Sequence, residues 1–175
     1  MLVTVLVCFG IVGTTYAWLV AKTAPLKNTF TAGNINITLS ESTSTNRKMV
    51  PGAQLEENPK VTVKANSEDC WLFIRLDKSQ NFDTFLSFEM EEGWTAVGGE
   101  RGIYYREVFL NENTDQEFFI LKDNLVKAND TTTKQQYDAL GELDYPLLTL
   151  TAYAVQKKGF DTVSAAWTQA KTLDD

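Results

Sequence analysis

Histidine is absent from all 175 residues of the chain, and this absence limits the chemistry that the other polar side chains can perform. The Ser-His-Asp and Cys-His arrangements use an imidazole as general base, and the HExxH zinc peptidases use two histidines as metal ligands. None of these sites can be built here. Zinc would have only carboxylates and thiols as ligands, which is a poor tetrahedral set. The composition therefore excludes most families of hydrolases.

Carboxylates are the groups that could still catalyse a reaction, and Glu89, Glu91 and Glu92 cluster beside Trp94. A glycosidase needs two carboxyl groups about 5 Å or about 6.5–9.5 Å apart, next to a surface that stacks a sugar. Glu89 and Glu91 would share one face of a strand. The same run is also typical of a solvated strand end followed by a turn, and we favour that interpretation. We therefore predict that the protein is not an enzyme and has no cofactor, with a histidine-free hydrolase as the less favoured alternative.

Two polar segments, 111–117 and 127–133, gather oxygen ligands of the kind that bind calcium. Neither matches the EF-hand loop, and Asn and Asp are common in surface turns, which is the interpretation we favour. The glycines of the segment 97–102 lack the spacing of a phosphate-binding P-loop. The net charge of −7 argues against nucleic acid and against anionic lipid surfaces, since both require basic patches.

The first 21 residues contain no charged side chain. An apolar run that ends in small residues is typical of a secretory signal peptide, with a cut between Ala17 and Trp18. We expect residues 1–17 to be a signal peptide that signal peptidase removes, so that the membrane is contacted only through this leader. The usual basic n-region is missing, which indicates a natural start upstream. An uncleaved membrane anchor is the alternative, since about 20 apolar residues can span a bilayer.

Residues 18–175 have the length of one ordinary domain, which can bury its core without a metal or a disulfide. Cys70 would be the only cysteine left after cleavage. It lies in CWLFIRL, a predicted strand, where a small buried thiol is common. An intermolecular disulfide is the alternative role for this odd cysteine.

Alternating apolar and polar residues predict an all-β fold, an antiparallel β-sandwich of about seven to nine strands with one or two short helices. In 34–39 the apolar Ile35, Ile37 and Leu39 alternate with polar residues, whereas 70–76 is apolar on both faces and predicts a strand inside a sheet. Other strands are expected at 60–64, 85–90, 102–109, 117–121 and 147–156. Helices are expected at 131–140 and 161–171, the latter with Asp161 as its N-cap.

Several sequence blocks occur in a characteristic order: a leader ending GTTYA-W, then NTFTAGNINITLSES, a Pro51–Gly52 turn, KVTVKANSED with WLFIRL, and AYAVQKKGF followed by AAW. In this order they resemble the TasA/camelysin family of secreted proteins, whose leaders are cut by the SipW type of signal peptidase. The likeness covers nearly all of residues 18–175. The positions that carry it are Phe30, Gly33, Ile35, Ile37, Leu39, Pro51, Gly52, Ala154, Val155, Gln156, Gly159, Phe160 and Trp167.

This resemblance implies a jelly-roll-like β-sandwich that is secreted to the bacterial cell surface or extracellular matrix. In fibres of the family, the freed N-terminal segment of one subunit adds as a strand to its neighbour, so the partner would be a second copy or a homologous subunit. The donor strand here would be residues 18–27, beginning with Trp18, Leu19, Val20 and Ala21. Edge strands accept such a strand because their N–H and C=O groups are unpaired, and head-to-tail addition grows filaments. Pro25 would remove one ladder bond.

The sequence therefore predicts a secreted structural subunit or accessory of a cell-surface or biofilm matrix fibre. The alternative is a monomeric surface module that binds glycan or protein through exposed aromatic anchors such as Trp94, Tyr104 and Tyr105. Core packing is the competing role of these three side chains, and we favour it for at least two of them. The metallopeptidase activity described for some relatives is not expected, because no residues here match a histidine-based metal site.

Overall fold

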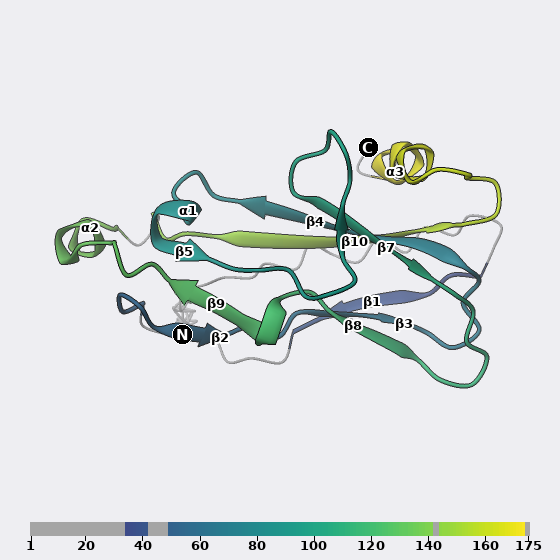
Figure 1. Ribbon diagram of the computed structural model, residues 1–175, viewed down its shortest axis with the longest axis horizontal. Coiled ribbons are helices and arrows are strands. Elements are labelled where there is room, and N and C mark those ends of the chain that lie inside the picture. The colour runs from purple at the N-terminus through teal and green to yellow at the C-terminus, as the bar shows by residue number, and fades with distance from the viewer. Residues whose placement is uncertain (1–33, 42–48, 142–143, 174–175) are drawn as a thin grey trace, which may run out of the picture.

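The computed structural model describes residues 34–41, 49–141 and 144–173 (Figure 1). Within these ranges it contains ten β-strands, three short α-helices and one 3-10 turn, and every strand pair is antiparallel. The predicted all-β fold is therefore confirmed. The expected signal peptide 1–17, the expected donor strand 18–27, and the family positions Phe30 and Gly33 lie outside the described residues.

The strands fall into three sheets. The long sheet has the order β10-β4-β7-β6, and two three-stranded sheets have the orders β1-β3-β8 and β2-β9-β5. The strands are β1 (Ile37–Ser40), β2 (Gln54–Glu56), β3 (Lys60–Val63), β4 (Cys70–Lys78), β5 (Leu86–Ser87), β6 (Thr95–Ala96), β7 (Ile103–Val108), β8 (Gln116–Phe119), β9 (Leu125–Ala128) and β10 (Leu148–Gln156). The helices are α1 (Phe82–Phe85), α2 (Lys134–Asp138) and α3 (Val163–Lys171), with the 3-10 turn η1 at Lys122–Asn124.

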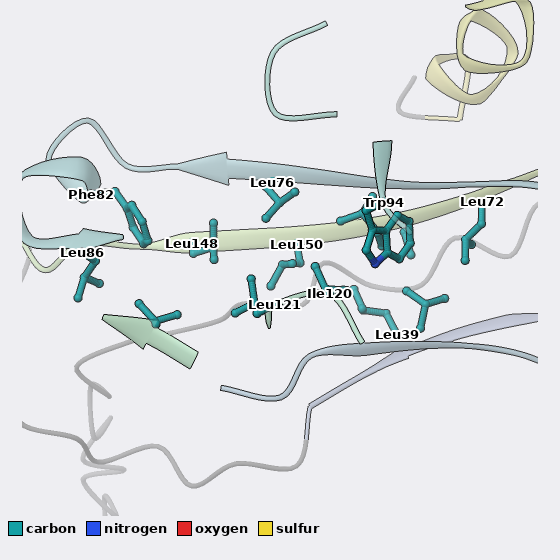
Figure 2. Close-up of a cluster of buried hydrophobic side chains, with 14 of the residues drawn as sticks. Leu39, Leu72, Leu76, Phe82, Leu86, Trp94, Ile120, Leu121, Leu148 and Leu150 are labelled. Carbon is teal, nitrogen blue, oxygen red and sulfur yellow. The ribbon is translucent and has the colours of Figure 1, made fainter. Parts of the chain in front are cut away.

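The long sheet forms one layer of a sandwich, and β1, β3 and β8 with β2 and β9 form the other (Figure 1). The main core lies between these layers. Figure 2 shows Leu72 and Leu76 of β4 and Leu150 of β10 pointing into it, toward Ile120 and Leu121 of the opposite layer. All five side chains are buried. Their removal from water is the main force that holds the two layers together.

Strand β4 is buried on both faces, as its sequence predicts. Residues at even positions, such as Leu72 and Ile74, belong to the main core, whereas Trp71 and Phe73 belong to a second cluster on the outer face of the long sheet. The strand pairs with β10 on one side and with β7 on the other. A strand in this position needs apolar residues on both faces because neither face meets water.

Helix α3 covers the outer face of the long sheet (Figure 1). Its Trp167 is 3% exposed, and its ring centroid lies 5.3 Å from that of Phe73 and 5.4 Å from that of Tyr153. The helix is present as predicted, but the expected N-cap is wrong. Thr162, not Asp161, is the N-cap, since its hydroxyl accepts a hydrogen bond from the Ala165 N–H (3.2 Å).

The strand predicted at 85–90 is mostly replaced by other structure. Residues Phe82–Phe85 form the single helical turn α1, and β5 contains only Leu86 and Ser87. Phe82 and Phe85 are both buried. Residues three apart lie on the same side of a helical turn but on opposite faces of a strand, so the turn lets both rings enter the core. The predicted helix at 131–140 is present but shorter, as α2, and a capping box from Thr133 begins it.

The Pro51–Gly52 turn predicted from the sequence precedes β2. The N–H of Ala53 donates to the C=O of Val50 (2.9 Å), and Gly52 has φ +77°. Proline at the second position and a positive φ at the third define a type II turn, which only glycine adopts without strain. In the described part of the chain, no helix combines the length and the hydropathy needed to cross a membrane.

Candidate functional site

The edge of the long sheet formed by β10 is the candidate functional site. Within the described residues, β10 pairs with β4 on one side and with no strand on the other. The strand is nine residues long, and its sequence LTLTAYAVQ contains neither a charge nor a proline. Proteins normally protect an open edge with lysine, proline, a bulge or a very short strand. Strand β10 contains neither lysine nor proline, and with nine residues it is not a very short strand.

The remaining edge strands of the described fold are much shorter. Strands β5 and β6 have two residues each, β2 has three, and β1 and β8 have four. The edge strand β8 also carries Glu117, whose carboxylate forms a 2.7 Å ion pair with Lys60. Short and charged edges discourage pairing with another chain. Among the edges that the structure describes, β10 therefore offers the longest unprotected ladder.

The hydrogen-bond pattern identifies which groups face this open edge. The N–H of Ser79 donates to the C=O of Leu147, and the N–H of Lys157 donates to the C=O of Asp69, so odd-numbered residues at both ends of β10 bond toward β4. In an antiparallel ladder, successive residues direct their backbone groups to opposite sides. The even-numbered residues of β10, among them Ala152 and Ala154, therefore direct their N–H and C=O groups to the open edge.

Strand β1 lies on the same side of the sandwich. It is the edge of its own sheet, and it contacts β10 across the two layers. Ile37 and Leu39 are buried in the main core, and Ile35 packs against it just before the strand. The structure thus brings β1, which contains Ile37 and Leu39, into contact with β10, which contains Ala154, Val155 and Gln156. All five residues are positions that carry the sequence resemblance.

The three family positions of β10 have different environments. Ala154 is half-buried at the margin of the main core, and Val155 is buried in the outer-face cluster beneath α3. The side-chain amide of Gln156 donates a hydrogen bond to the carboxylate of Glu68. These contacts keep the end of β10 in register and leave the backbone groups of Ala154 facing outward.

The last three family positions support this strand from outside. Gly159 has φ +100°, in the turn that follows β10. The backbone C=O of Phe160 accepts a hydrogen bond from Trp71 Nε1 (3.2 Å), and Trp167 packs on the outer face. Gly159 allows the turn between β10 and α3, whereas the contacts of Phe160 and Trp167 attach the segment of α3 to the long sheet.

The aromatic residues considered as binding anchors are mostly part of the protein interior. Trp94 is 9% exposed, and its Nε1 donates to the C=O of Phe119 (2.8 Å). Tyr105 is half-buried and lies edge-on to Trp71 with 5.8 Å between ring centroids. Tyr104 is half-buried and packs against the main core. The prediction that at least two of these three rings pack in the core is confirmed, and an exposed Trp94 is excluded.

Glu89, one of the three carboxylates near Trp94, lacks the raised pKa of a general acid. Glu89 and Lys122 form an ion pair (2.7 Å) on the surface, and the hydrogen bond from Lys122 lowers the pKa of Glu89. A general acid of this class needs a raised pKa instead. The buried ring of Trp94 provides no sugar-stacking surface beside them. In the part of the chain that the structure describes, no group of three or more His, Cys, Asp and Glu could hold a metal ion.

The polar segment 111–117 forms a surface turn, as favoured from the sequence. The Asn111 side-chain oxygen accepts hydrogen bonds from the N–H groups of Asn113 (3.0 Å) and Thr114 (3.2 Å). Asp115 accepts from the Ala65 N–H (2.9 Å) and pairs with Lys64 (2.8 Å). These oxygen atoms are occupied in holding the loop before β8.

Cys70 begins β4 and is fully buried in the main core. Burial, with a smaller contribution from the negative charge of Asp69, raises its pKa to about 12. The side chain is therefore a neutral thiol at every physiological pH, and reactions of cysteine require the thiolate. In the folded protein Cys70 is a core residue and not a partner for an intermolecular disulfide.

No family model, no curated protein and no solved structure matches this chain at a significant level.

Proposed function

We propose that this protein is a secreted structural subunit or accessory of a bacterial cell-surface or biofilm matrix fibre. In this proposal the subunit has a jelly-roll-like fold and resembles the TasA/camelysin family. A strand from the N-terminal segment 18–27 of one copy adds to the open edge of β10 in the next copy. Export removes residues 1–17 and frees this segment. The protein has no enzymatic activity, and its partner is itself or a homologous subunit.

The observation that carries the proposal is the unprotected edge of β10. An added antiparallel or parallel strand would satisfy the outward N–H and C=O groups of the even-numbered residues, and each such hydrogen bond contributes about 0.5–1.5 kcal/mol net. Several bonds along nine residues would offset the entropy of ordering the donor. Side chains of the donor would meet β1 at the same side of the sandwich.

The proposal is tested first by removing the donor. The chain beginning at Trp18 is expected to form filaments in negative-stain electron microscopy and to scatter light as a polymer. The same chain without Trp18–Lys27 is expected to remain monomeric with an unchanged circular-dichroism spectrum. If both chains stay monomeric at high concentration, self-assembly through this segment is wrong.

A point substitution tests the acceptor edge separately. Ala154→Pro removes one N–H group that faces the open edge and leaves the bonds between β10 and β4 in place. Ala154→Ser keeps that N–H and is the matched control. We expect the proline variant to stay folded and to polymerise much less, and the serine variant to polymerise normally. Equal polymerisation of the two variants would show that this edge does not accept the strand.

A further inference from the structure

Strand β4 is longer than its neighbour β7, and this mismatch contributes to a hollow of about 720 Å³ beside the end of β4. The pairing of β7 with β4 extends from Cys70 to Arg75, and the last bond runs from the Leu76 N–H to the C=O of Gly102 (2.8 Å). Beyond it, Asp77 and Lys78 have no β7 residue beside them, so they line the hollow. The hollow is separate from the β10 edge because β4 lies between β10 and β7.

Two aromatic rings contribute apolar surface to the hollow. Tyr104 of β7 and Phe88, which follows β5, are both half-buried and both line it. Phe88 is held in place by an edge-on contact with Phe82 (5.9 Å between centroids) and by the Lys78 ammonium 4.7 Å from its ring centroid. A partly exposed ring of this kind can contact the C–H face of a ligand.

The charged groups of the hollow are balanced. Asp77 and Asp83 contribute two negative charges, and Lys78 and Arg101 contribute two positive ones. Lys78 already pairs with Asp83 (2.7 Å), and Asp77 pairs with Arg75 (2.9 Å). A multivalent anion would meet the two carboxylates, and a metal cation would meet Lys78 and Arg101. The hollow therefore does not favour a strongly charged ligand of either sign.

Arg101 and Gln80 add hydrogen-bonding capacity that the protein does not use. Within the described residues, neither side chain takes part in a hydrogen bond or an ion pair, and both are exposed at the margin of the hollow. The guanidinium group offers five N–H donors, and the amide offers two donors and an acceptor. The carboxylates of Asp77 and Asp83 retain further acceptor positions beyond their ion pairs.

From this combination we propose that the hollow beside the end of β4 binds a neutral saccharide. The rings of Phe88 and Tyr104 lie among mostly polar lining residues. A sugar presents C–H faces together with hydroxyl donors and acceptors, so both kinds of surface have a counterpart on this ligand. The volume is sufficient for a short oligosaccharide. The site requires neither polymerisation nor the N-terminal segment, so it does not depend on the proposed fibre function.

The test uses three soluble hexasaccharides: cellohexaose and chitohexaose, which are neutral, and hexagalacturonate, which is anionic. The protein is the chain without residues 1–27, which the fibre proposal expects to remain a folded monomer, so that solution NMR is possible whether or not the longer chain polymerises. Binding is followed by backbone amide shifts in two-dimensional NMR. We expect at least one neutral sugar to shift the amides of 76–80 and 101–104 with a dissociation constant of about 1 mM or tighter, and the anionic sugar to cause no saturating shift.

Substitutions at the two unengaged side chains then locate the site. The double variant Gln80→Ala/Arg101→Ala is expected to bind the neutral sugar at least about tenfold more weakly. Its melting temperature should be unchanged, because both side chains are exposed and neither forms a hydrogen bond or an ion pair within the described residues. Lys158→Ala, which is exposed and lines a different pocket, is the matched control and should bind normally.

Three results would overturn the saccharide site. These are no shift with either neutral sugar at about 10 mM, shifts confined to residues away from the hollow, or binding that the double variant retains in full. Saturating binding of hexagalacturonate, without binding of either neutral sugar, would also refute the proposal that the ligand is a neutral saccharide. Loss of filaments in the truncated chain leaves all of these outcomes unaffected, so failure of the site and failure of the fibre proposal are distinguishable.

Discussion

The guanidinium group of Arg106 lies over the ring of Phe118, 4.4 Å from its centroid. Arg106 belongs to β7 in the long sheet, and Phe118 belongs to β8 in the opposite layer. The same guanidinium lies 5.2 Å from the ring centroid of Trp94. Burial lowers the pKa of Arg106, although the group remains charged because the pKa of arginine starts far above neutrality. This stack joins the two layers on the side of the sandwich opposite β10.

The two sides of the sandwich therefore differ. On the β7/β8 side, the Arg106 stack and the hydrogen bond from Trp94 Nε1 to the C=O of Phe119 join the layers. On the β10/β1 side, the two strands meet as edges, and the described residues contribute no further strand. This asymmetry is a physical reason to expect strand addition at β10 and not at β8.

Removing the Arg106 stack should weaken the fold. Arg106→Ala is expected to lower the free energy of unfolding by about 1–3 kcal/mol, because two cation–π contacts and the packing of the side-chain stem are lost. Arg106→Lys keeps the charge but not the planar group, so it should restore only part of this loss. The measurement is urea unfolding followed by tryptophan fluorescence. Lys158→Ala, at an exposed lysine, is the control, and an Arg106→Ala protein as stable as this control would refute the role of the stack.

Gly93 should be sensitive to a single methyl group. A Cβ atom at this position would lie 2.3 Å from a terminal guanidinium nitrogen of Arg106, and Gly93 has φ +87°. Gly99 has a similar φ of +81° but open space around it, so Gly99→Ala measures the backbone strain alone, about 1–2 kcal/mol. We expect Gly93→Ala to be more destabilising than Gly99→Ala in urea unfolding, because the guanidinium group of Arg106 would have to leave its position over Phe118 and Trp94.

The additional loss of stability in Gly93→Ala, compared with Gly99→Ala, should also depend on Arg106. Combining Gly93→Ala with Arg106→Ala removes the clashing group, so the double variant should lose less stability than the sum of the two single variants. Strict additivity would mean that the methyl group at position 93 does not meet Arg106.

The Cys70 thiol should be unreactive until the protein unfolds. Burial raises its pKa from the ordinary 9.0 to about 12, so the thiolate is scarce in the folded state at pH 8. In the chain beginning at Trp18, where Cys70 is the only cysteine, labelling by an aromatic disulfide reagent is expected only at denaturing urea concentrations. Rapid labelling of the native protein would contradict the buried position.

The same pKa gives a direction for the pH dependence of stability. Below pH 9 the thiol is protonated in both the folded and the unfolded state. Between about pH 9 and about pH 12 the unfolded thiol ionises while the folded thiol does not, so the free energy of unfolding decreases as pH rises. Cys70→Ala should lack this contribution. The comparison of the two proteins over that range isolates it from the titration of tyrosine and lysine.

Trp167 should contribute most of the packing energy between α3 and the long sheet. Trp167→Ala is expected to lower the free energy of unfolding by about 3–5 kcal/mol, because a buried ring that contacts Phe73 and Tyr153 leaves a cavity. Thr168→Ala, at an exposed neighbour on the same helix, is expected to change it by less than about 1 kcal/mol. Thermal unfolding followed by circular dichroism measures both, and similar losses would refute a dominant role for the ring.

The sequence predicted most elements because local patterns carry that information. Alternation at 34–39 and apolar residues on both faces at 70–76 predicted β1 and the central strand β4, and Thr133 begins a helix within the predicted range 131–140. The strand predicted at 85–90 was mostly wrong, because burial in the tertiary structure decides the backbone conformation there. In 82–87 two phenylalanines enter the core through a helical turn, and the apolar pattern of so short a run does not distinguish a strand from such a turn.

The sequence by itself determined the composition of β10 and the missing imidazole: an uncharged, proline-free strand in a chain that lacks the base of most hydrolases. Only the tertiary structure decided that this strand lies at an edge, with β1 beside it, and that Arg106 reaches Phe118 on the other side. The physical reason is that periodicity reports which face of a strand is buried, whereas strand order depends on contacts between residues far apart in the chain. The open edge of β10 and the hollow beside the longer strand β4 both result from this strand order.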